Sequence, residues 1–128
     1  MGRQHEVDHA VDTEVSNILI NLGIPVNLQG FKYLKHCIKH AISSPGLMHR
    51  VTKQLYPTVA VECDVTEARV ERAIRHAILV AYNRHKIINL NKVFNLSIFL
   101  DYEKPTNSEL IALIADRMIT KHHLVGKG

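Results

Sequence analysis

The sequence lacks the features that mark several large classes of protein. Of its 128 residues only two are cysteines, Cys37 and Cys63, and they form no CxxC pair, which excludes a disulfide scaffold. No uninterrupted apolar run approaches the roughly 18 residues that a membrane helix needs. Residues 1–16 carry four acidic residues against one arginine and have no apolar stretch like that of a signal peptide. We therefore expect a cytoplasmic protein that is not embedded in a membrane.

The chain does have the size and composition of one globular domain, together with an unevenly distributed positive charge. Hydrophobic residues make up 46% and charged residues 22% of the sequence, as in proteins with a packed core. The formal net charge is +4 when the histidines are neutral. Residues 67–92 alone hold six basic residues against two acidic ones, so the net charge of this stretch equals that of the whole chain. Such a local excess points to a polyanionic partner.

The hydrophobic pattern predicts an all-α fold of about six helices with no convincing sheet. Apolar residues recur at helical spacing in segments that are separated by turn residues. The expected helices run from Thr13 to Gly23, from 30 to 43, from near 47 with a kink or a fresh start at Pro57, from 67 to about 84, from 89 to 95, and from a cap at Asn107 or Ser108. Residues 96–102 fit either a short strand or an extended loop. We expect residues 13–122 to form the domain, with flexible segments at 1–12 and 123–128.

Two of these helices fit a helix-turn-helix unit. Such a unit needs a small residue where the helices cross, an apolar residue in the turn, and apolar positions on the second helix that pack back on the first. Ala60, Val65, Val70 and Ala73 have this spacing. Asp64 stands where glycine is common, and aspartate tolerates the left-handed backbone that the turn favours. Helix pairs in ordinary all-α cores share this pattern. Whether it indicates DNA binding therefore depends on the residues that the second helix exposes on its outer face.

The outer face of the second helix is basic. On a helical wheel the apolar side consists of Val70, Ile74, Ala77 and Ala81. Arg72 lies directly opposite, with Arg69, Arg75 and His76 beside it, and Thr66 precedes the helix as its N-cap. A charged helical face is often merely solvated. Together with the helix-turn-helix pattern, however, it favours double-stranded DNA as the partner, with this helix in the major groove.

Longer stretches of the chain resemble the C-terminal effector domain of the stage zero sporulation protein A family, the response regulators of endospore-forming bacteria. The most specific stretch is Thr66–Ala81 (TEARVERAIRHAILVA), and Val51–Pro57 and Lys104–Glu109 match as well. The resemblance covers roughly Val15 to His122. It implies a six-helix domain with a helix-turn-helix that binds promoter boxes as a homodimer or tandem dimer and contacts the sigma subunit of RNA polymerase. The phosphorylated receiver domain of the family has no counterpart here, so we expect an output domain alone.

Three positions depart from the family pattern. The family has glycine where this chain has His85 and Asn95, and Leu79 replaces a polar or acidic residue on the outer face. These changes leave the expected base-reading residues intact.

Residue by residue, the resemblance implies a DNA site. Arg72 would read a guanine in the major groove, and its guanidinium fork independently suits guanine O6 and N7. Glu71, Arg75 and His76 would make further base or nearby contacts, with Glu71 accepting from cytosine N4 or holding an arginine in place. The residues expected at the DNA backbone are Thr66, Arg69, Lys104, Thr106 and Asn107. The last three belong to a turn that is expected near the DNA or a neighbouring protomer.

A metal enzyme is one competing interpretation. His36 and His40 stand at i,i+4 with Cys37 beside one of them, but no cysteine or carboxylate follows at a spacing that completes a site. The sequence also holds no nucleotide-binding loop and no supported Ser/His/Asp arrangement. We therefore expect no metal, no cofactor and no catalysis.

A protein-interaction module is the other competing interpretation. Lys32, Lys35 and Lys39 share one face of the second expected helix, where an acidic partner could bind. The chain would then be an all-α interaction module without a specific DNA site. Salt dependence separates the two classes, because DNA binding through several phosphates weakens steeply as salt increases.

Overall fold

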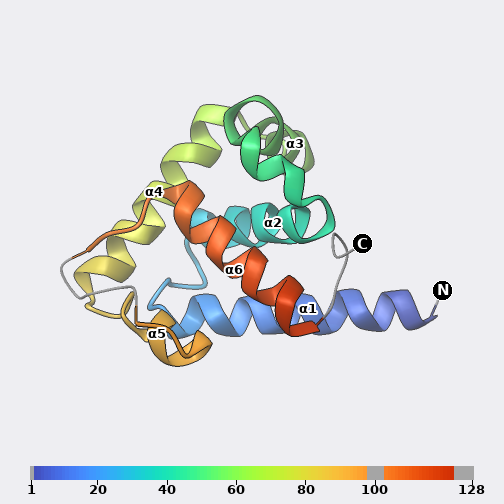
Figure 1. Ribbon diagram of the computed structural model, residues 1–128. Helices are drawn as coiled ribbons and strands as arrows, with labels where there is room; N and C mark the ends of the chain where they lie inside the picture. The colour runs from blue at the N-terminus through green and yellow to red at the C-terminus, as the bar shows by residue number, and fades with distance from the viewer. Residues whose placement is uncertain (1, 98–102, 123–128) are drawn as a thin grey trace.

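The computed structural model describes residues 2–97 and 103–122, and every regular element within these two ranges is helical. Figure 1 shows α2 (Gln29–Ser43) at the centre, with α6 (Asn107–His122) crossing it and α1 (Gly2–Asn21) along the bottom. Around them lie α3 (Tyr56–Cys63), α4 (Glu67–Asn83) and the short α5 (Asn89–Phe94). The prediction of an all-α fold with about six helices is confirmed. The predicted strand or loop at 96–102 lies largely outside the described residues, as does the tail at 123–128.

The core is built around α2, which packs mainly against α4 and α6. Eight of its fifteen residues are buried, and Leu34, Cys37 and Ile38 are completely inaccessible. At its first turn, Gly30 touches α4 so closely that an added Cβ would lie 2.3 Å from the carbonyl oxygen of Ala73. The alanine-rich side of α4, which the sequence identified, therefore meets a glycine on α2 that the sequence analysis did not single out.

The first helix begins earlier than predicted. The sequence placed its start after Thr13, whereas α1 begins at Gly2, because no proline or glycine interrupts the chain between Gly2 and Gly23. Polar contacts also attach its middle to the rest of the domain: Asp12 lies 3.1 Å from Lys35 Nζ, and Glu14 lies 2.9 Å from Lys121 Nζ. The stop was predicted correctly, since α1 ends just before Gly23, whose φ of 83° suits glycine.

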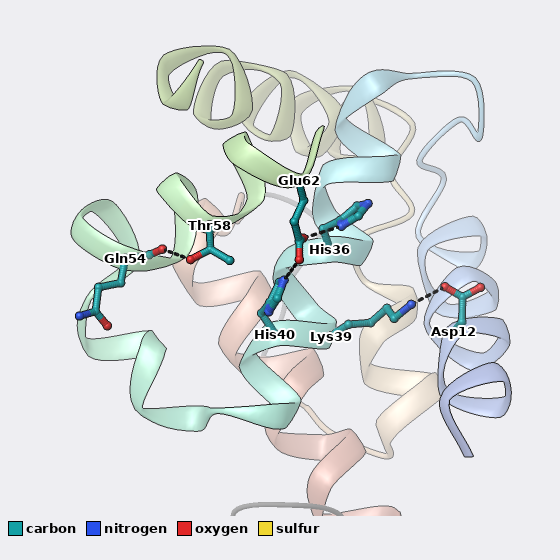
Figure 2. A network of polar contacts seen from close by, with 7 residues as sticks. All are labelled: Asp12, His36, Lys39, His40, Gln54, Thr58 and Glu62. Carbon is teal, nitrogen blue, oxygen red and sulfur yellow. Dashed lines mark hydrogen bonds and ion pairs between the residues drawn. The ribbon is translucent and has the colours of Figure 1, made fainter. Parts of the chain in front are cut away.

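The third helical region consists of three consecutive segments. A 3-10 helix, η1 (Pro45–His49), precedes a π-helix, η2 (Val51–Leu55), and α3 follows. Pro57 occupies the first turn of α3, where its missing N–H breaks no helical hydrogen bond. The Thr58 hydroxyl donates to the Gln54 carbonyl oxygen at 2.8 Å across the junction of η2 and α3 (Figure 2). Pro57 therefore lies where the hydrogen bonding changes from π-helical to α-helical, and the backbone at Leu55 and Tyr56 stays helical across this change.

The last helix begins at Asn107, but its cap is Thr106 rather than Asn107 or Ser108. The backbone N–H of Glu109 donates to Thr106 Oγ1 at 3.1 Å, and the N–H of Thr106 donates to Glu109 Oε1 at 2.8 Å. These reciprocal bonds are a capping box, which satisfies two backbone donors at the helix start. Thr106 is the cap because, of Thr106, Asn107 and Ser108, only Thr106 is followed by a glutamate three residues later. The other helices, predicted at 30–43, 67–84 and 89–95, agree with α2, α4 and α5 to within one residue at each end.

Candidate nucleic-acid interface

The turn between α3 and α4 has the left-handed residue that the sequence predicted. Asp64 has φ 55° and ψ 50°. Its N–H donates to the carbonyl oxygen of Val61 at 3.2 Å, and the N–H of Val65 donates to that of Ala60 at 3.0 Å. This pair of bonds is a Schellman motif, which ends a helix sharply and turns the chain toward the next one. Thr66 then starts α4, since its Oγ1 accepts from the N–H of Arg69 at 3.1 Å.

The two helices pack through the small and apolar residues expected at the crossing. Ala60 of α3 is only 5% exposed, and Val70 of α4 is completely buried. Val65 in the turn and Ala73 on α4 are partly buried and pack against the same core. This arrangement of α3, turn and α4 is consistent with a helix-turn-helix, and within the described residues the opposite side of α4 is exposed.

The four basic residues of that opposite side are exposed to solvent. They are Arg69, Arg72, Arg75 and His76. Glu71 lies next to them and pairs with Arg75, with 3.0 Å between Arg75 Nη1 and Glu71 Oε2. In the unbound domain Glu71 therefore holds an arginine, one of the two roles considered for it.

Arg69 and Arg72 also share a shallow depression with the turn. It has a volume of about 580 Å³ and is lined by Asp64, Val65, Thr66, Arg69 and Arg72. The structure thus brings the N-cap Thr66 together with two of the predicted DNA-contacting arginines, whereas Arg75 and His76 lie about one turn further along α4. The carboxylate of Asp64 at this edge is the one negative group in the depression.

The turn at 104–107 lies against the same two helices. Asn107 Nδ2 donates to the backbone carbonyl oxygen of Glu71 at 3.1 Å and to the hydroxyl oxygen of Tyr56 at 3.2 Å. Burial raises the pKa of the Tyr56 hydroxyl, so this group stays protonated. Lys104 and Thr106 remain exposed beside it. Asn107 was predicted at the DNA backbone, and in the unbound domain its side chain joins α6 to α3 and α4.

Sequence reasoning missed a carboxylate that completes a polar cluster around the two histidines of α2. Glu62, near the end of α3, lies 3.0 Å from His36 Nδ1 and 2.7 Å from His40 Nε2 (Figure 2). Cys37 between them points into the core, and burial raises the pKa of its thiol to about 12, which keeps it protonated. Within residues 2–97 and 103–122, no group of three histidine, cysteine or acidic side chains has a geometry that could hold a metal ion. The cluster instead joins α2 to α3.

The comparison with known families shows to which family this chain belongs. Residues 15–118 match the family model described as "Sporulation initiation factor Spo0A C terminal". The chain belongs to this family. Members of this family are DNA-binding effector domains of sporulation. The family is regulatory and is not a family of enzymes. None of the helices in the described part of the chain has the length and apolar character that a membrane-spanning segment requires.

Two of the positions at which the sequence analysis expected glycine in the family have a left-handed backbone in this chain. His85, just after α4, has φ 58°, and Asn95, just after α5, has φ 55°. Both positions therefore adopt the left-handed conformation in which glycine has no steric penalty. Asparagine and histidine are among the residues that enter this region most readily, so both helices can end here without glycine.

Proposed function

We propose that α4 lies in the major groove of promoter DNA, with Arg72 reading a guanine and Arg75 and His76 contacting neighbouring bases. The observation that carries this proposal is the exposed basic side of α4 directly after the left-handed turn at Asp64. Side chains near the start of such a helix are the ones that reach base edges in helix-turn-helix proteins. Glu71 positions Arg75 through their ion pair. When this pair opens, the Glu71 carboxylate can accept a hydrogen bond from a cytosine amino group.

In this proposal, two groups of residues contact the DNA backbone. Thr66 and Arg69 lie at the shallow depression beside the turn, where the positive end of the α4 dipole faces outward. Lys104, Thr106 and Asn107 form the second group, because the hydrogen bond from Asn107 to the Glu71 carbonyl holds that turn against α4. Contact with the RNA polymerase sigma subunit and binding as paired copies on adjacent promoter boxes complete the proposed function, and both rest on family membership.

The proposal is tested by selecting binding sites from random duplexes and then measuring variants on the selected site. Arg72→Ala should cost about 1–3 kcal/mol and relax preference at one base position. Arg69→Ala should weaken binding to all sequences alike and reduce the salt slope by about 0.9, the loss of one phosphate contact. Lys32→Ala on α2, an exposed lysine in the groove between α1 and α2, is the matched control and should leave both quantities unchanged. If Arg72→Ala keeps the full base preference, its assigned role is wrong.

A further inference from the structure

A groove between α1 and α2 lies apart from the proposed DNA site. It has a volume of about 420 Å³, and its lining includes Asp12 from α1, Val26 from the connecting loop, and Lys32, Lys35 and Lys39 from α2. Figure 2 shows Lys39 reaching toward Asp12 on the side of α2 that lies between α1 and α3. The contact of α2 with α4, by contrast, is made by Gly30 on its buried side.

The groove already holds a carboxylate. Asp12 Oδ1 lies 3.1 Å from Lys35 Nζ and 3.2 Å from Lys39 Nζ. Partial burial raises the pKa of Asp12, but the two lysines outweigh this effect and lower it overall. Two ammonium groups on neighbouring turns of α2 are therefore spaced to bind one carboxylate between them.

The lining of the groove has more positive than negative charge, and part of it is apolar. Three lysines face a single aspartate, and Lys32 is exposed with no ion pair to any described residue. Val26 is 62% exposed at one side, and the ring of Phe31 forms a buried part of the floor. The groove therefore offers unbalanced positive charge together with an exposed apolar side chain, two features that a segment of a protein can complement. A DNA duplex presents phosphates on a convex, rigid surface and has nothing to place against Val26 and Phe31.

We propose that this groove binds an acidic segment of a partner protein. One carboxylate of the segment pairs with Lys32, and a second competes with Asp12 for Lys35 and Lys39. An apolar side chain of the segment packs against Val26 and Phe31. The domain would then use α4 for DNA and the opposite surface of α2 for a protein, and the second contact does not depend on the first.

The test uses a defined probe, a twelve-residue synthetic peptide in which glutamate alternates with leucine. In a ¹⁵N-detected NMR titration, the amide signals of Val26, Phe31, Lys32 and Lys35 should shift together and saturate. A matched peptide with glutamine in place of glutamate should produce no saturating shift. Equal binding of the glutamine peptide would overturn the proposal. So would the same amide shifts from inorganic phosphate at the same concentration, or from duplex DNA.

Two variants change the affinity in opposite directions, which separates this site from general charge attraction. Lys32→Glu should weaken peptide binding about tenfold, since it replaces an attraction by a repulsion. Asp12→Asn should strengthen binding several-fold, because it removes the internal competitor. Lys53→Glu, an equal charge change on the exposed part of η2, should have no effect beyond a small uniform one. Equal weakening by Lys32→Glu and Lys53→Glu, or weaker binding by a folded Asp12→Asn protein, would refute the proposal.

Discussion

The close approach of α2 and α4 leads to a prediction for Gly30→Ala. A Cβ at this position would lie 2.3 Å from the Ala73 carbonyl oxygen and 2.7 Å from the Ala77 Cβ. Carbon atoms pack best at about 3.5–4.0 Å, so the two helices would have to separate by roughly 1 Å. Because the first of these atoms belongs to the backbone of α4, no change of side-chain rotamer can relieve the contact.

The expected cost follows from two opposing effects. Overpacking of a well-filled core costs about 1–3 kcal/mol. Alanine is favoured over glycine within a helix by about 0.5–1 kcal/mol, which offsets part of this cost. We therefore expect Gly30→Ala to lower the free energy of unfolding by about 1–2 kcal/mol. For a domain of this size, that corresponds to a fall in Tm of roughly 4–10 °C.

The assay is thermal and urea unfolding followed by circular dichroism, with Gly46→Ala as the matched control. Gly46 lies in η1, where an added Cβ would meet nothing within 4 Å, and its φ is not positive. The same chemical change should be neutral or slightly stabilising there, because alanine restricts the unfolded chain. If Gly30→Ala unfolds at the same temperature as Gly46→Ala, the contact between α2 and α4 is not as close as described, and the reasoning fails.

Three further predictions concern the turn, the histidine cluster and the cap of α6. Asp64→Gly should raise the free energy of unfolding by about 1 kcal/mol by relieving the left-handed strain, and Asp64→Asn, which removes only the charge, should gain less; equal melting temperatures for all three proteins would contradict this. Partial burial raises the pKa of Glu62, but hydrogen bonds from His40 and His36 lower it overall from 4.5, so its stabilising effect is present above that pH and is lost as the pH falls through the lowered pKa. Glu62→Gln should therefore destabilise the domain by about 0.5 kcal/mol near neutral pH and not at about pH 3, as measured by urea unfolding at both pH values. A penalty that is independent of pH would argue against hydrogen bonds from the histidines to an ionised Glu62 carboxylate. Thr106→Ala should cost about 1 kcal/mol through loss of the cap, whereas Ser108→Ala should cost nothing measurable in the same unfolding assay.

Much of the fold and part of the candidate site were predictable because they depend on neighbours in the sequence. The 3.6-residue period placed α2, α4 and α5 to within one residue at each end. The crossing residue Ala60, the left-handed Asp64 and the cap at Thr66 were also anticipated, since each is set within a few residues of the turn. The start of α1 was misplaced because residues 2–12 are polar, and their helical state does not show in an apolar pattern.

The sequence by itself thus determined the helices, the turn between α3 and α4, and the position of the positive charge on the outer side of α4. Only the tertiary structure decided which distant residues meet. It brought Gly30 against Ala73. It also placed Asn107 on the Glu71 carbonyl and set the Glu62 carboxylate between two histidines of α2. Such contacts depend on the angles and distances at which helices cross, and these are set by the packing of the whole core rather than by any local pattern.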